Sequence, residues 1–337
     1  CLLLFTSGTT GISPKIVPLT YRNLLSSSIS SALRLKTDPN DIWILYLPLH
    51  HMGGLSPLFR SIISGTAIAA IDSPSPQNLQ LCMQKYGITC LSTVPTLLTK
   101  LLNEQVDLST LRILLLGGGP IPESLLAQCK SLSIPVHPTY GATEASSQIT
   151  TATPSDLIKN PGTAGRPLNS LNLAIQNEQN QLVDEGECGE IIVSGPMVSK
   201  GYFSYDAHPS SKLSNHTFRT GDIGYVRDGF LWIMGRIDDL IITGGEKVYP
   251  AEIENLLLTH PAVSDVAVFS EPDDRWGSKI VAIVVKNSPT LSKEEIISFC
   301  QKKLSKYKIP KTIHFVDSIP RTVTGTFNSL TFTSNNK

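Results

Sequence analysis

The sequence predicts an α/β fold with a large N-terminal domain of parallel α/β layers, a small β subdomain within it, and a small α+β C-terminal domain. Three changes of pattern along the 337 residues lead to this prediction. Apolar runs alternate with segments of helical spacing up to residue 116, which indicates parallel β–α–β units. After residue 160, short β-like runs lie between glycine, aspartate and asparagine turns, which indicates a small antiparallel barrel or sheet. From residue 239 the pattern is that of a compact α+β domain.

The N-terminal elements begin with an apolar run over residues 1–5, which we interpret as a buried strand already under way at Cys1. The domain is therefore expected to be incomplete at its start. A loop rich in glycine and threonine follows over 6–15, and a helix is predicted over 21–35. Strands are then predicted over 42–47, 88–94 and 112–116, with a helix over 95–103.

The later elements are shorter. Strands of the β subdomain are predicted over 171–175, 189–194, 224–226 and 230–234. The C-terminal domain is predicted to contain helices over 251–258 and 293–303 and strands over 263–269 and 280–285. The connection near residues 236–239 is short, so we expect a hinge and divide the chain into domains 1–237 and 238–337.

The composition argues against several classes of protein. Hydrophobic residues make up 41% and charged residues 17%, which is typical of a folded globular protein. The 28 basic and 28 acidic residues cancel, which argues against nucleic acid or an anionic membrane as a partner. No apolar run approaches the ~20 residues that span a bilayer, and we find no signal-peptide pattern.

The six cysteines are scattered, without the short paired spacings of zinc or redox sites. We interpret them as buried or incidental thiols of a reducing compartment and expect a cytoplasmic protein. The sequence leaves open whether the protein is a monomer or a homo-oligomer. The cysteines are Cys1, Cys82, Cys90, Cys129, Cys188 and Cys300.

The loop after the first predicted strand has the composition of a polyphosphate-binding loop. Small residues let backbone N–H groups approach phosphate, hydroxyls add donors, and a lysine supplies positive charge. The spacing differs from that of P-loop NTPases, and a flexible surface loop of this composition remains the alternative. The candidate nucleotide-binding residues in it are Thr6, Ser7, Gly8, Thr9, Thr10, Gly11 and Lys15.

Five stretches resemble, in the same order, motifs of the superfamily of acyl-coenzyme A synthetases, nonribosomal adenylation domains and luciferases. Together they span nearly the whole chain, and five motifs in register are far more specific than any one. The resemblance implies an enzyme that uses ATP and Mg²⁺ to activate a carboxylic acid and then forms its coenzyme A thioester. The stretches are residues 6–11, 140–144, 220–222, 235–239 and 244–254.

The stretch at 140–144 resembles the adenylate-site motif of this superfamily. Tyr140 offers a flat face for adenine, with Gly141 beside it. Thr143 can donate to the α-phosphate, and Glu144 supplies a hard oxygen ligand for Mg²⁺. The resemblance therefore implies that Thr143 and Glu144 are catalytic and that Glu144 binds the metal.

Three further groups complete the predicted nucleotide and acyl site. Asp222 can accept hydrogen bonds from the ribose hydroxyls, and Arg236 can donate to the nucleotide. An Asx turn at Asp222 and a surface arginine at Arg236 are the alternatives. Backbone close to the nucleotide and acyl group is predicted after the strand over 112–116, at Gly117, Gly118 and Gly119.

The resemblance also implies a mobile C-terminal domain. Asp238 is then the hinge about which this domain rotates between the two reaction steps. The rotation brings a loop to the pantetheine tunnel, and this loop consists of Gly244, Gly245 and Glu246.

The residues after position 50 carry the prediction of the substrate. His51 and the Gly-Gly-Leu that follows one residue later resemble the subgroup of o-succinylbenzoate–CoA ligases of menaquinone or phylloquinone biosynthesis. The resemblance places His51 at the acyl pocket and a cation at Arg60. Because Arg60 lies in an apolar run and an unpaired buried charge is costly, the second carboxylate of a diacid is a suitable partner. A solvent-facing Arg60 on a helix, and another aryl- or fatty-acyl-CoA ligase, remain alternatives.

Two departures from the family pattern concern catalysis. Residues Ile12 and Ser13 place one extra residue before Lys15, which changes the reach of that lysine. Thr326 stands where the family's Pro-Arg-Thr-x-x-Gly-Lys motif has its catalytic lysine. A neutral hydroxyl cannot stabilise the charge that develops during adenylation, and loss of such a contact costs about 10²–10³ in rate. A nucleotide-binding relic without turnover is therefore a further alternative.

Overall fold

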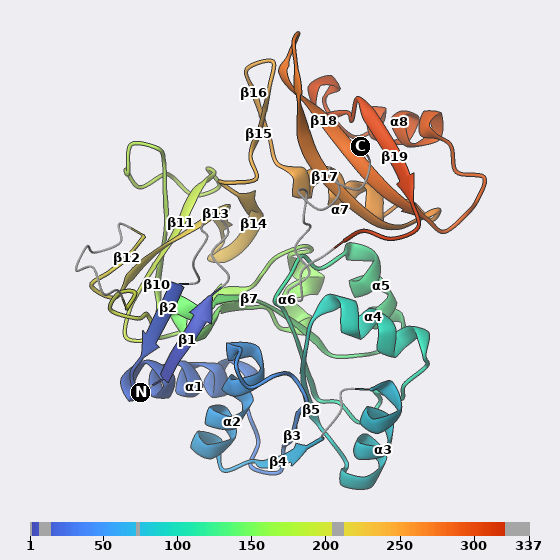
Figure 1. Ribbon diagram of the computed structural model, residues 1–337. Coiled ribbons are helices and arrows are strands. Elements are labelled where there is room, and N and C mark those ends of the chain that lie inside the picture. The colour runs from blue at the N-terminus through green and yellow to red at the C-terminus, as the bar shows by residue number, and fades with distance from the viewer. Residues whose placement is uncertain (1, 7–14, 72–74, 204–211, 321–337) are drawn as a thin grey trace. The chain divides into compact units, whose positions relative to one another are not determined.

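The computed structural model describes residues 2–6, 15–71, 75–203 and 212–320 (Figure 1). The chain forms two compact units. The first contains Cys1–Ile121 and Gln128–Ile233, and the second contains Pro122–Ala127 and Met234–Lys337. None of the helices in the described part of the chain is long and apolar enough to cross a membrane.

The first unit contains a seven-stranded sheet with the order β4-β3-β5-β6-β7-β8-β9 among the described residues. The pairs from β4 to β7 are parallel, whereas β8 and β9 are antiparallel. This confirms the predicted parallel α/β layer and adds an antiparallel end. The bounds are β3 Ile42–Leu45, β4 Ala67–Ala70, β5 Cys90–Thr93, β6 Ile113–Leu116, β7 Val136–Ala142, β8 Ser147–Thr151 and β9 Arg166–Pro167.

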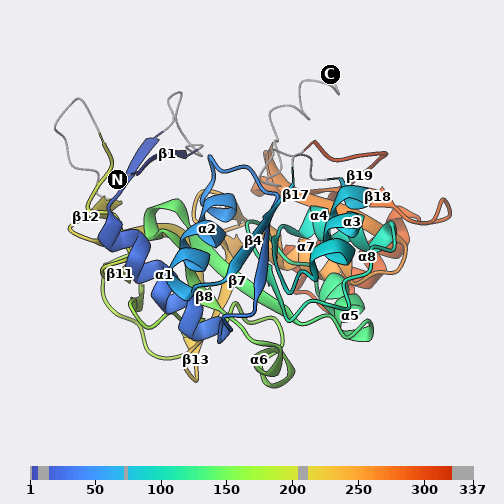
Figure 2. The ribbon, with the colours of Figure 1, turned by 90° about the horizontal axis from the view of Figure 1, so that it is seen from below.

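Helices cover both faces of this sheet (Figures 1 and 2). The chain moves from β3 to β4 in one direction and from β4 onward to β7 in the other. Because such crossovers are right-handed, α2 lies on one face and α3 and α4 lie on the other, and α1 packs beside α2. The helices are α1 Tyr21–Leu35, α2 Met52–Ser64, α3 Pro76–Tyr86, α4 Pro95–Asn103, α5 Glu123–Ser131, α6 Pro154–Lys159 and the 3₁₀ turn η1 Thr143–Ala145.

The strand predicted at the start of the chain forms a hairpin outside the parallel sheet. Strand β1 (Leu2–Thr6) pairs antiparallel with β2 (Lys15–Leu19). The predicted strand is present, but Leu3 and Phe5 are 55% and 61% exposed while Leu4 is buried, so the prediction that the strand is buried is wrong. An unbroken apolar run hides the alternation of a strand that packs through one face only.

The small β subdomain is an antiparallel sheet with the order β10-β11-β13-β12, to which β14 is added next to β13. This confirms the change of pattern predicted after residue 160. Its buried face includes Ile191, Val193 and Phe218. The bounds are β10 Asn172–Gln176, β11 Gly189–Ser194, β12 Leu213–Ser214, β13 Thr217–Arg227 and β14 Phe230–Arg236.

The second unit is an α+β domain, as predicted. Its sheet has the order β17-β18-β19, and alternate residues of β18 such as Ile280, Ala282 and Val284 enter an aliphatic core. The bounds are β15 Ile241–Thr243, β16 Glu246–Val248, α7 Pro250–Leu258, β17 Val263–Asp273, β18 Gly277–Lys286, α8 Lys293–Gln301, η2 Lys306–Lys308 and β19 Thr312–Val316.

Candidate active site

The adenylate-type motif lies in a tight reversal between β7 and β8. Strand β7 carries Tyr140 and Gly141, and η1 carries Thr143 and Glu144. A Cβ at Gly141 would lie 1.7 Å from the carbonyl oxygen of Ser147, so the two strands approach each other only because residue 141 is glycine. The motif is thus held in one conformation by the strand that follows it.

The backbone after the motif adopts conformations that are uncommon for serine. Ser146 has φ 56° and Ser147 has φ 103°. The carbonyl of Ser146 accepts from the Ser27 hydroxyl at 2.7 Å. The Ser146 hydroxyl donates to the Met197 carbonyl at 2.8 Å. Such backbone persists where surrounding contacts over-determine it, as these do, and it is concentrated at functional sites.

Tyr140 and Asp222, which are 82 residues apart, come together in the structure. The Tyr140 hydroxyl donates to Asp222 Oδ2 at 2.5 Å. The Thr220 hydroxyl accepts from the Asp222 backbone N–H at 3.0 Å and donates to the Ile191 carbonyl, which fixes the turn that presents Asp222. The structure therefore brings these two side chains, both predicted to bind the nucleotide, into direct contact.

The glycines after β6 lie at the carboxyl end of the parallel strands, where ligands of such sheets bind. A Cβ at Gly117 would lie 2.7 Å from both the methyl carbon and the carbonyl oxygen of Thr139. Gly118 has φ +81°, a conformation that L side chains rarely adopt. The backbone can therefore pass close to β7, next to Tyr140, only with glycines here.

Glu144 is buried, with 9% of its surface exposed. Its Oε1 accepts from the Tyr202 hydroxyl at 2.7 Å, and its carbonyl accepts from the Ser199 N–H at 2.8 Å. The described residues form no cluster of three or more metal-ligating side chains. A single carboxylate still fits Mg²⁺, which commonly binds through one or two carboxylates together with substrate phosphates and water.

The two ends of the predicted phosphate loop meet at the hairpin of β1 and β2. Thr6 pairs with Lys15, and the Thr6 hydroxyl lies 3.4 Å from the Lys15 carbonyl oxygen. The Lys15 Nζ lies 5.0 Å from the centre of the Tyr202 ring. The residues between them, with Ser7, Gly8, Thr9, Thr10 and Gly11, lie outside the described residues.

His51 lies where the order of the strands reverses. The chain leaves β3 toward α2 and leaves β5 toward α4, so the carboxyl ends of these adjacent strands form a topological switch point. His51 is the N-cap residue of α2, and its ring centre lies 4.2 Å from that of His50. Partial desolvation and the adjacent His50 lower the pKa of His51, which favours a neutral imidazole at pH 7.

Arg60 is a buried cation on α2, with 1% of its surface exposed, so the alternative of a solvent-facing arginine is wrong. Its guanidinium lies 4.3 Å from the Trp43 ring centre, and Nη2 donates to the Ser56 hydroxyl at 3.3 Å. Nη1 is buried and finds no hydrogen-bond partner among the described residues. Burial lowers the pKa of Arg60 to about 10, so the group stays charged at neutral pH.

The position of Arg60 along α2 limits what it can contact. It follows His51 by nine residues, which is about 13 Å along a helix. Trp43, against which it packs, pairs with Cys90 at the start of β5. Arg60 therefore lies toward the amino ends of β3 and β5, while His51 lies at the carboxyl ends.

The predicted coenzyme A loop is the tip of a hairpin in the second unit. Thr243 of β15 pairs with Glu246 of β16, which leaves Gly244 and Gly245 as a two-residue turn with φ of +59° and +84°. These angles are typical of a type I′ turn. The Gly244 N–H donates to the Trp276 carbonyl at 2.9 Å, and the exposed Glu246 begins β16.

Arg236 and Asp238 also belong to the second unit. Arg236 is the last residue of β14 and is half-buried. Asp238 is exposed in the turn that follows, five residues after the first unit ends. Thr326 lies outside the described residues.

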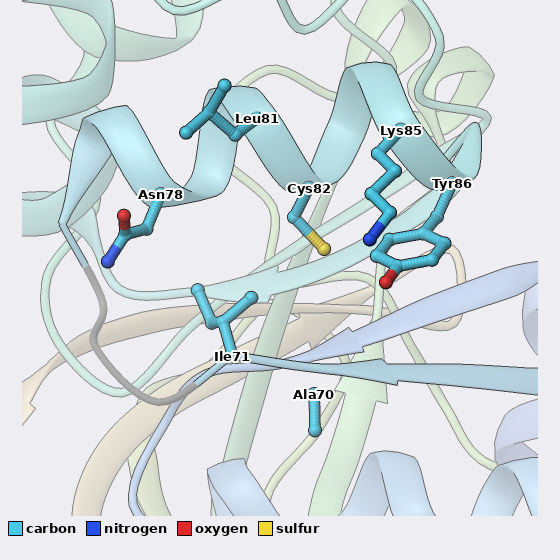
Figure 3. Close-up of a pocket in the computed structure, with 7 residues that line it drawn as sticks. All are labelled: Ala70, Ile71, Asn78, Leu81, Cys82, Lys85 and Tyr86. Carbon is cyan, nitrogen blue, oxygen red and sulfur yellow. The ribbon is translucent and has the colours of Figure 1, made fainter.

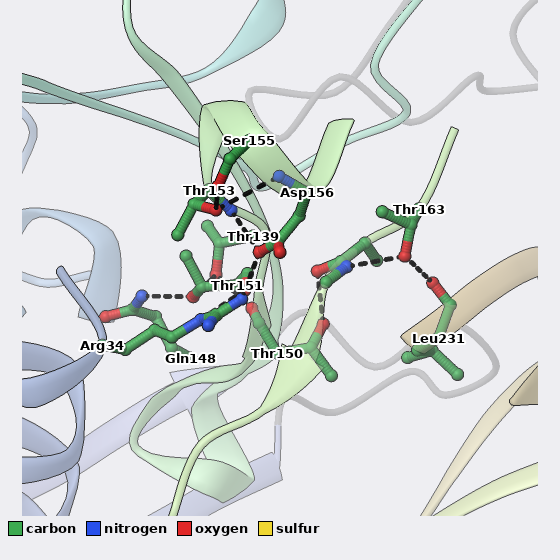
Figure 4. Close-up of polar contacts among 12 residues, drawn as sticks. Arg34, Thr139, Gln148, Thr150, Thr151, Thr153, Ser155, Asp156, Thr163 and Leu231 are labelled. Carbon is green, nitrogen blue, oxygen red and sulfur yellow. Dashed lines mark hydrogen bonds and ion pairs between the residues drawn. The ribbon is translucent and has the colours of Figure 1, made fainter. Parts of the chain in front are cut away.

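Sequence reasoning missed a polar network between α1 and β8 (Figure 4). The Ser31 hydroxyl donates to Gln148 Oε1 at 2.5 Å, and Gln148 Nε2 donates to the Thr151 hydroxyl at 2.7 Å. Arg34 donates to the Thr151 carbonyl and to Asp156. The buried serines at positions 27, 28, 30 and 31 were a signal, because they give α1 a polar face at helical spacing.

A hollow of about 320 Å³ lies between the edge strand β4 and α3 (Figure 3). It contains none of the sequence-predicted site residues, and β3 and β5 separate β4 from β6. We therefore do not place the active site there. The lining residues are Ala70, Ile71, Asn78, Leu81, Cys82, Lys85 and Tyr86.

Two protein-family models match the chain. The model for the AMP-binding enzyme matches residues 1–203, and the model for the AMP-binding enzyme C-terminal domain matches residues 252–326. The chain belongs to the AMP-binding enzyme family. This assignment agrees with the resemblance drawn from the five motifs.

Individual AMP-binding enzymes resemble the chain along most of its length. The chain is 43% identical over 323 residues to a 2-succinylbenzoate–CoA ligase of Bacillus cereus and 42% identical over 324 residues to one of Bacillus cytotoxicus. These alignments cover 95% of the chain, which spans 66% of the length of either relative.

Solved structures of this family superpose on the chain. An o-succinylbenzoate coenzyme A synthetase (MenE) of Bacillus subtilis in complex with the acyl-adenylate intermediate OSB-AMP has TM-score 0.88 and 39% identity, covering 96% of this chain and 67% of that chain. The same enzyme with ATP and magnesium ion has TM-score 0.87. An ATP-bound MatB of Rhodopseudomonas palustris has TM-score 0.90 at 29% identity. This superposition covers 99% of this chain and 68% of that chain.

Proposed function

We propose that this AMP-binding enzyme activates o-succinylbenzoate with ATP and transfers it to coenzyme A, as a step of menaquinone or phylloquinone biosynthesis in the cytoplasm. The observation that carries the proposal is the contact of Tyr140 with Asp222, in the motif that also contains Glu144 and next to Thr139, which the backbone of Gly117 approaches closely. The names of the relatives at 42–43% identity support the choice of acid.

The first step joins the acid to the nucleotide. The carboxylate attacks the α-phosphorus of ATP, which gives the acyl-adenylate and releases pyrophosphate. Tyr140 and Asp222 hold adenine and ribose, Thr143 donates to the α-phosphate, and Glu144 is the residue that would hold Mg²⁺. When bound, this ion neutralises phosphate charge. We place His51 at the acyl group because it lies at the switch point of the sheet.

The second step uses the other unit. Rotation about Asp238 between domains 1–237 and 238–337 would bring the turn at Gly244 and Gly245, with Glu246, to the pantetheine chain. The thiol of coenzyme A then attacks the acyl carbon and AMP leaves. Arg236 would donate to the nucleotide during this sequence.

The acid preference tests the proposal. Pyrophosphate release is measured with ATP, Mg²⁺, coenzyme A and one acid at a time: o-succinylbenzoate, benzoate or a fatty acid. Release with o-succinylbenzoate alone supports the proposal, and release with either other acid at an equal rate contradicts it. Glu144→Ala serves as the inactive control.

Arg60 is a separate part of the proposal, in which its unpartnered Nη1 pairs with the second carboxylate of the acid. Arg60 is completely buried against Trp43, toward the amino ends of β3 and β5, so this contact requires movement of α2 as well as of Trp43. Arg60→Leu should then raise KM for o-succinylbenzoate and leave KM for benzoate unchanged. Equal effects on both acids would assign Arg60 to the packing of α2 alone.

The residue Thr326 supports a second candidate, a nucleotide-binding protein that does not form the adenylate. Synthetic acyl-adenylate with coenzyme A separates the two candidates, because thioester formation does not require the missing lysine. Thioester from the synthetic adenylate without pyrophosphate release from ATP would favour impaired adenylation, and Thr326→Lys should then restore it. ATP binding with no product in either assay would favour the relic.

A further inference from the structure

Tyr202 lies between two residues of the proposed site and contacts both. Its hydroxyl donates to Glu144 Oε1 at 2.7 Å, and its ring faces the Lys15 ammonium at 5.0 Å. Glu144 belongs to the adenylate-type motif, and Lys15 ends the predicted phosphate loop. One side chain therefore connects two groups that are 129 positions apart in the sequence.

The backbone around Tyr202 is fixed from two sides. On one side, the Phe203 N–H donates to the Ile16 carbonyl at 2.8 Å, and the Ser199 hydroxyl donates to the Pro18 carbonyl at 2.7 Å. On the other side, the Ser199 N–H donates to the Glu144 carbonyl at 2.8 Å. Residues 199–203 thus link strand β2 to the turn η1, and Tyr202 has little freedom to leave its position.

The chemistry of Tyr202 suits it to orient a metal ligand. A phenol is an O–H donor, and the Tyr202 hydroxyl lies 2.7 Å from Glu144 Oε1 in the geometry of a hydrogen bond to that oxygen. Donation to Oε1 fixes the rotation of the carboxylate and leaves Oε2 available to a cation. Hydrogen bonds of this kind to a metal-ligating group commonly change metal affinity or activity by 10–100-fold.

The ring of Tyr202 provides a second contact. An ammonium is attracted to the face of an aromatic ring within about 6 Å of its centre. This attraction holds Lys15 beside the end of the loop that would bind phosphate.

We propose that Tyr202 is a positioning residue, which orients the Glu144 carboxylate for Mg²⁺ through its hydroxyl and the Lys15 ammonium for the phosphates through its ring. The inference rests on the proposed function for the identity of both ligands. It goes beyond that function because it makes the Mg²⁺ dependence of ATP binding depend on Tyr202, which lies outside the five motifs.

The test compares three variants of the full chain. Tyr202→Phe removes the hydroxyl and keeps the ring, Tyr202→Leu removes both, and Tyr21→Phe removes a phenol hydroxyl from an exposed tyrosine at the start of α1 as the matched control. ATP binding is measured by calorimetry with and without Mg²⁺, which gives a readout independent of turnover. Pyrophosphate release gives kcat, KM for the acid and the Mg²⁺ concentration at half-maximal rate.

The expected result is a 10–100-fold rise in the Mg²⁺ concentration at which Tyr202→Phe binds ATP half-maximally. Its ATP affinity without Mg²⁺ and its KM for the acid should equal those of the wild type and of Tyr21→Phe. Tyr202→Leu should in addition bind ATP about 2–5-fold more weakly without Mg²⁺, because Lys15 loses the ring.

Equal Mg²⁺ dependence in Tyr202→Phe and the wild type would overturn the inference. Mg²⁺-dependent ATP binding without pyrophosphate release by the wild type would overturn the proposed function alone, since the binding measurements still judge Tyr202. Absence of Mg²⁺-dependent ATP binding by the wild type would overturn both.

Discussion

The adenylation motif of the first unit and the Gly244–Gly245 turn of the second unit are held in different ways. The motif and Ser146 just after it form hydrogen bonds with α1, with β13 and with residues 197–202, which are distant in sequence. The turn is the tip of a two-stranded hairpin whose shape follows from two adjacent glycines. Tertiary contacts therefore position the first site, whereas local backbone preference shapes the second.

This difference separates the effects of mutations in the two regions. A change at the motif should alter pyrophosphate release. A change in the polar network between α1 and β8 should also alter the free energy of unfolding. A change at the hairpin tip should affect thioester formation alone. The predictions below are ordered from the largest expected effect to the smallest.

Glu144→Ala removes the carboxylate at the centre of the motif and should lower the rate of pyrophosphate release by about 10²–10³. Glu104→Ala, at the C-terminal end of α4, is the matched control and should leave the rate unchanged. Stopped-flow detection of pyrophosphate measures both variants. A fall of less than threefold in Glu144→Ala would remove this residue from the first step.

His137, in β7 just before the motif, should make folding stability depend on pH. Burial lowers the pKa of His137 to about 4, while an unfolded histidine titrates near 6.5. The contribution of neutral His137 to the free energy of unfolding is complete above pH 6.5. It is lost as the pH falls to 4, because protonation then favours the unfolded state, and the loss amounts to about 3 kcal/mol. The stability difference between wild type and His137→Gln in urea, measured at pH 7 and at pH 4, should change by that amount. A constant difference would contradict the assignment.

Gly244→Val should disturb the hairpin tip. A Cβ there would lie 2.9 Å from Trp276 Cε3 in a backbone with φ +59°, so the turn must shift. Misplacement of about 1 Å can cost 10²-fold in rate, and we expect this loss in thioester formation from synthetic acyl-adenylate, with pyrophosphate release unchanged. Gly87→Asn, at the end of α3, is the control, because asparagine tolerates the left-handed conformation and nothing lies within 4 Å of the Cβ position there.

Gln148→Leu interrupts the network between α1 and β8 and should cost about 1–3 kcal/mol in the free energy of unfolding, since it leaves the buried Ser31 hydroxyl without its acceptor. Ser31→Ala combined with Gln148→Leu should cost less than the sum of the single changes, because the two side chains share one hydrogen bond. Urea denaturation measures all three variants. Additive costs would show that the network does not act as a unit.

The sequence predicts more of the fold than of the site. Helix α1 and the strands of the parallel sheet follow from hydrophobic spacing and capping signals that are local, such as Thr20 before α1. The one-sided burial of β1 could not be predicted, because its apolar run contains no polar residue to mark the exposed face. The hairpin at Gly244 and Gly245 was predictable from two glycines between short β-like runs.

The motifs identify the site residues but not their partners. The contacts of Tyr202 with Glu144 and of Tyr140 with Asp222 join residues 58 and 82 positions apart, and no periodic pattern reports such contacts. The burial of Arg60 was foreseeable from its apolar neighbours, whereas its packing on Trp43 depends on how α2 crosses β3. The sequence thus indicates which residues could act chemically, whereas their contacts depend on how the chain folds.

Direct detection of the adenylate tests the central claim of the account. The full chain is mixed with ATP, Mg²⁺ and o-succinylbenzoate in the absence of coenzyme A, and the quenched mixture is examined by mass spectrometry. The account predicts a species with the mass of the o-succinylbenzoyl-adenylate, which disappears when coenzyme A is added and the thioester forms. Binding of ATP with no such species at any time, and with none from benzoate or a fatty acid, would contradict it.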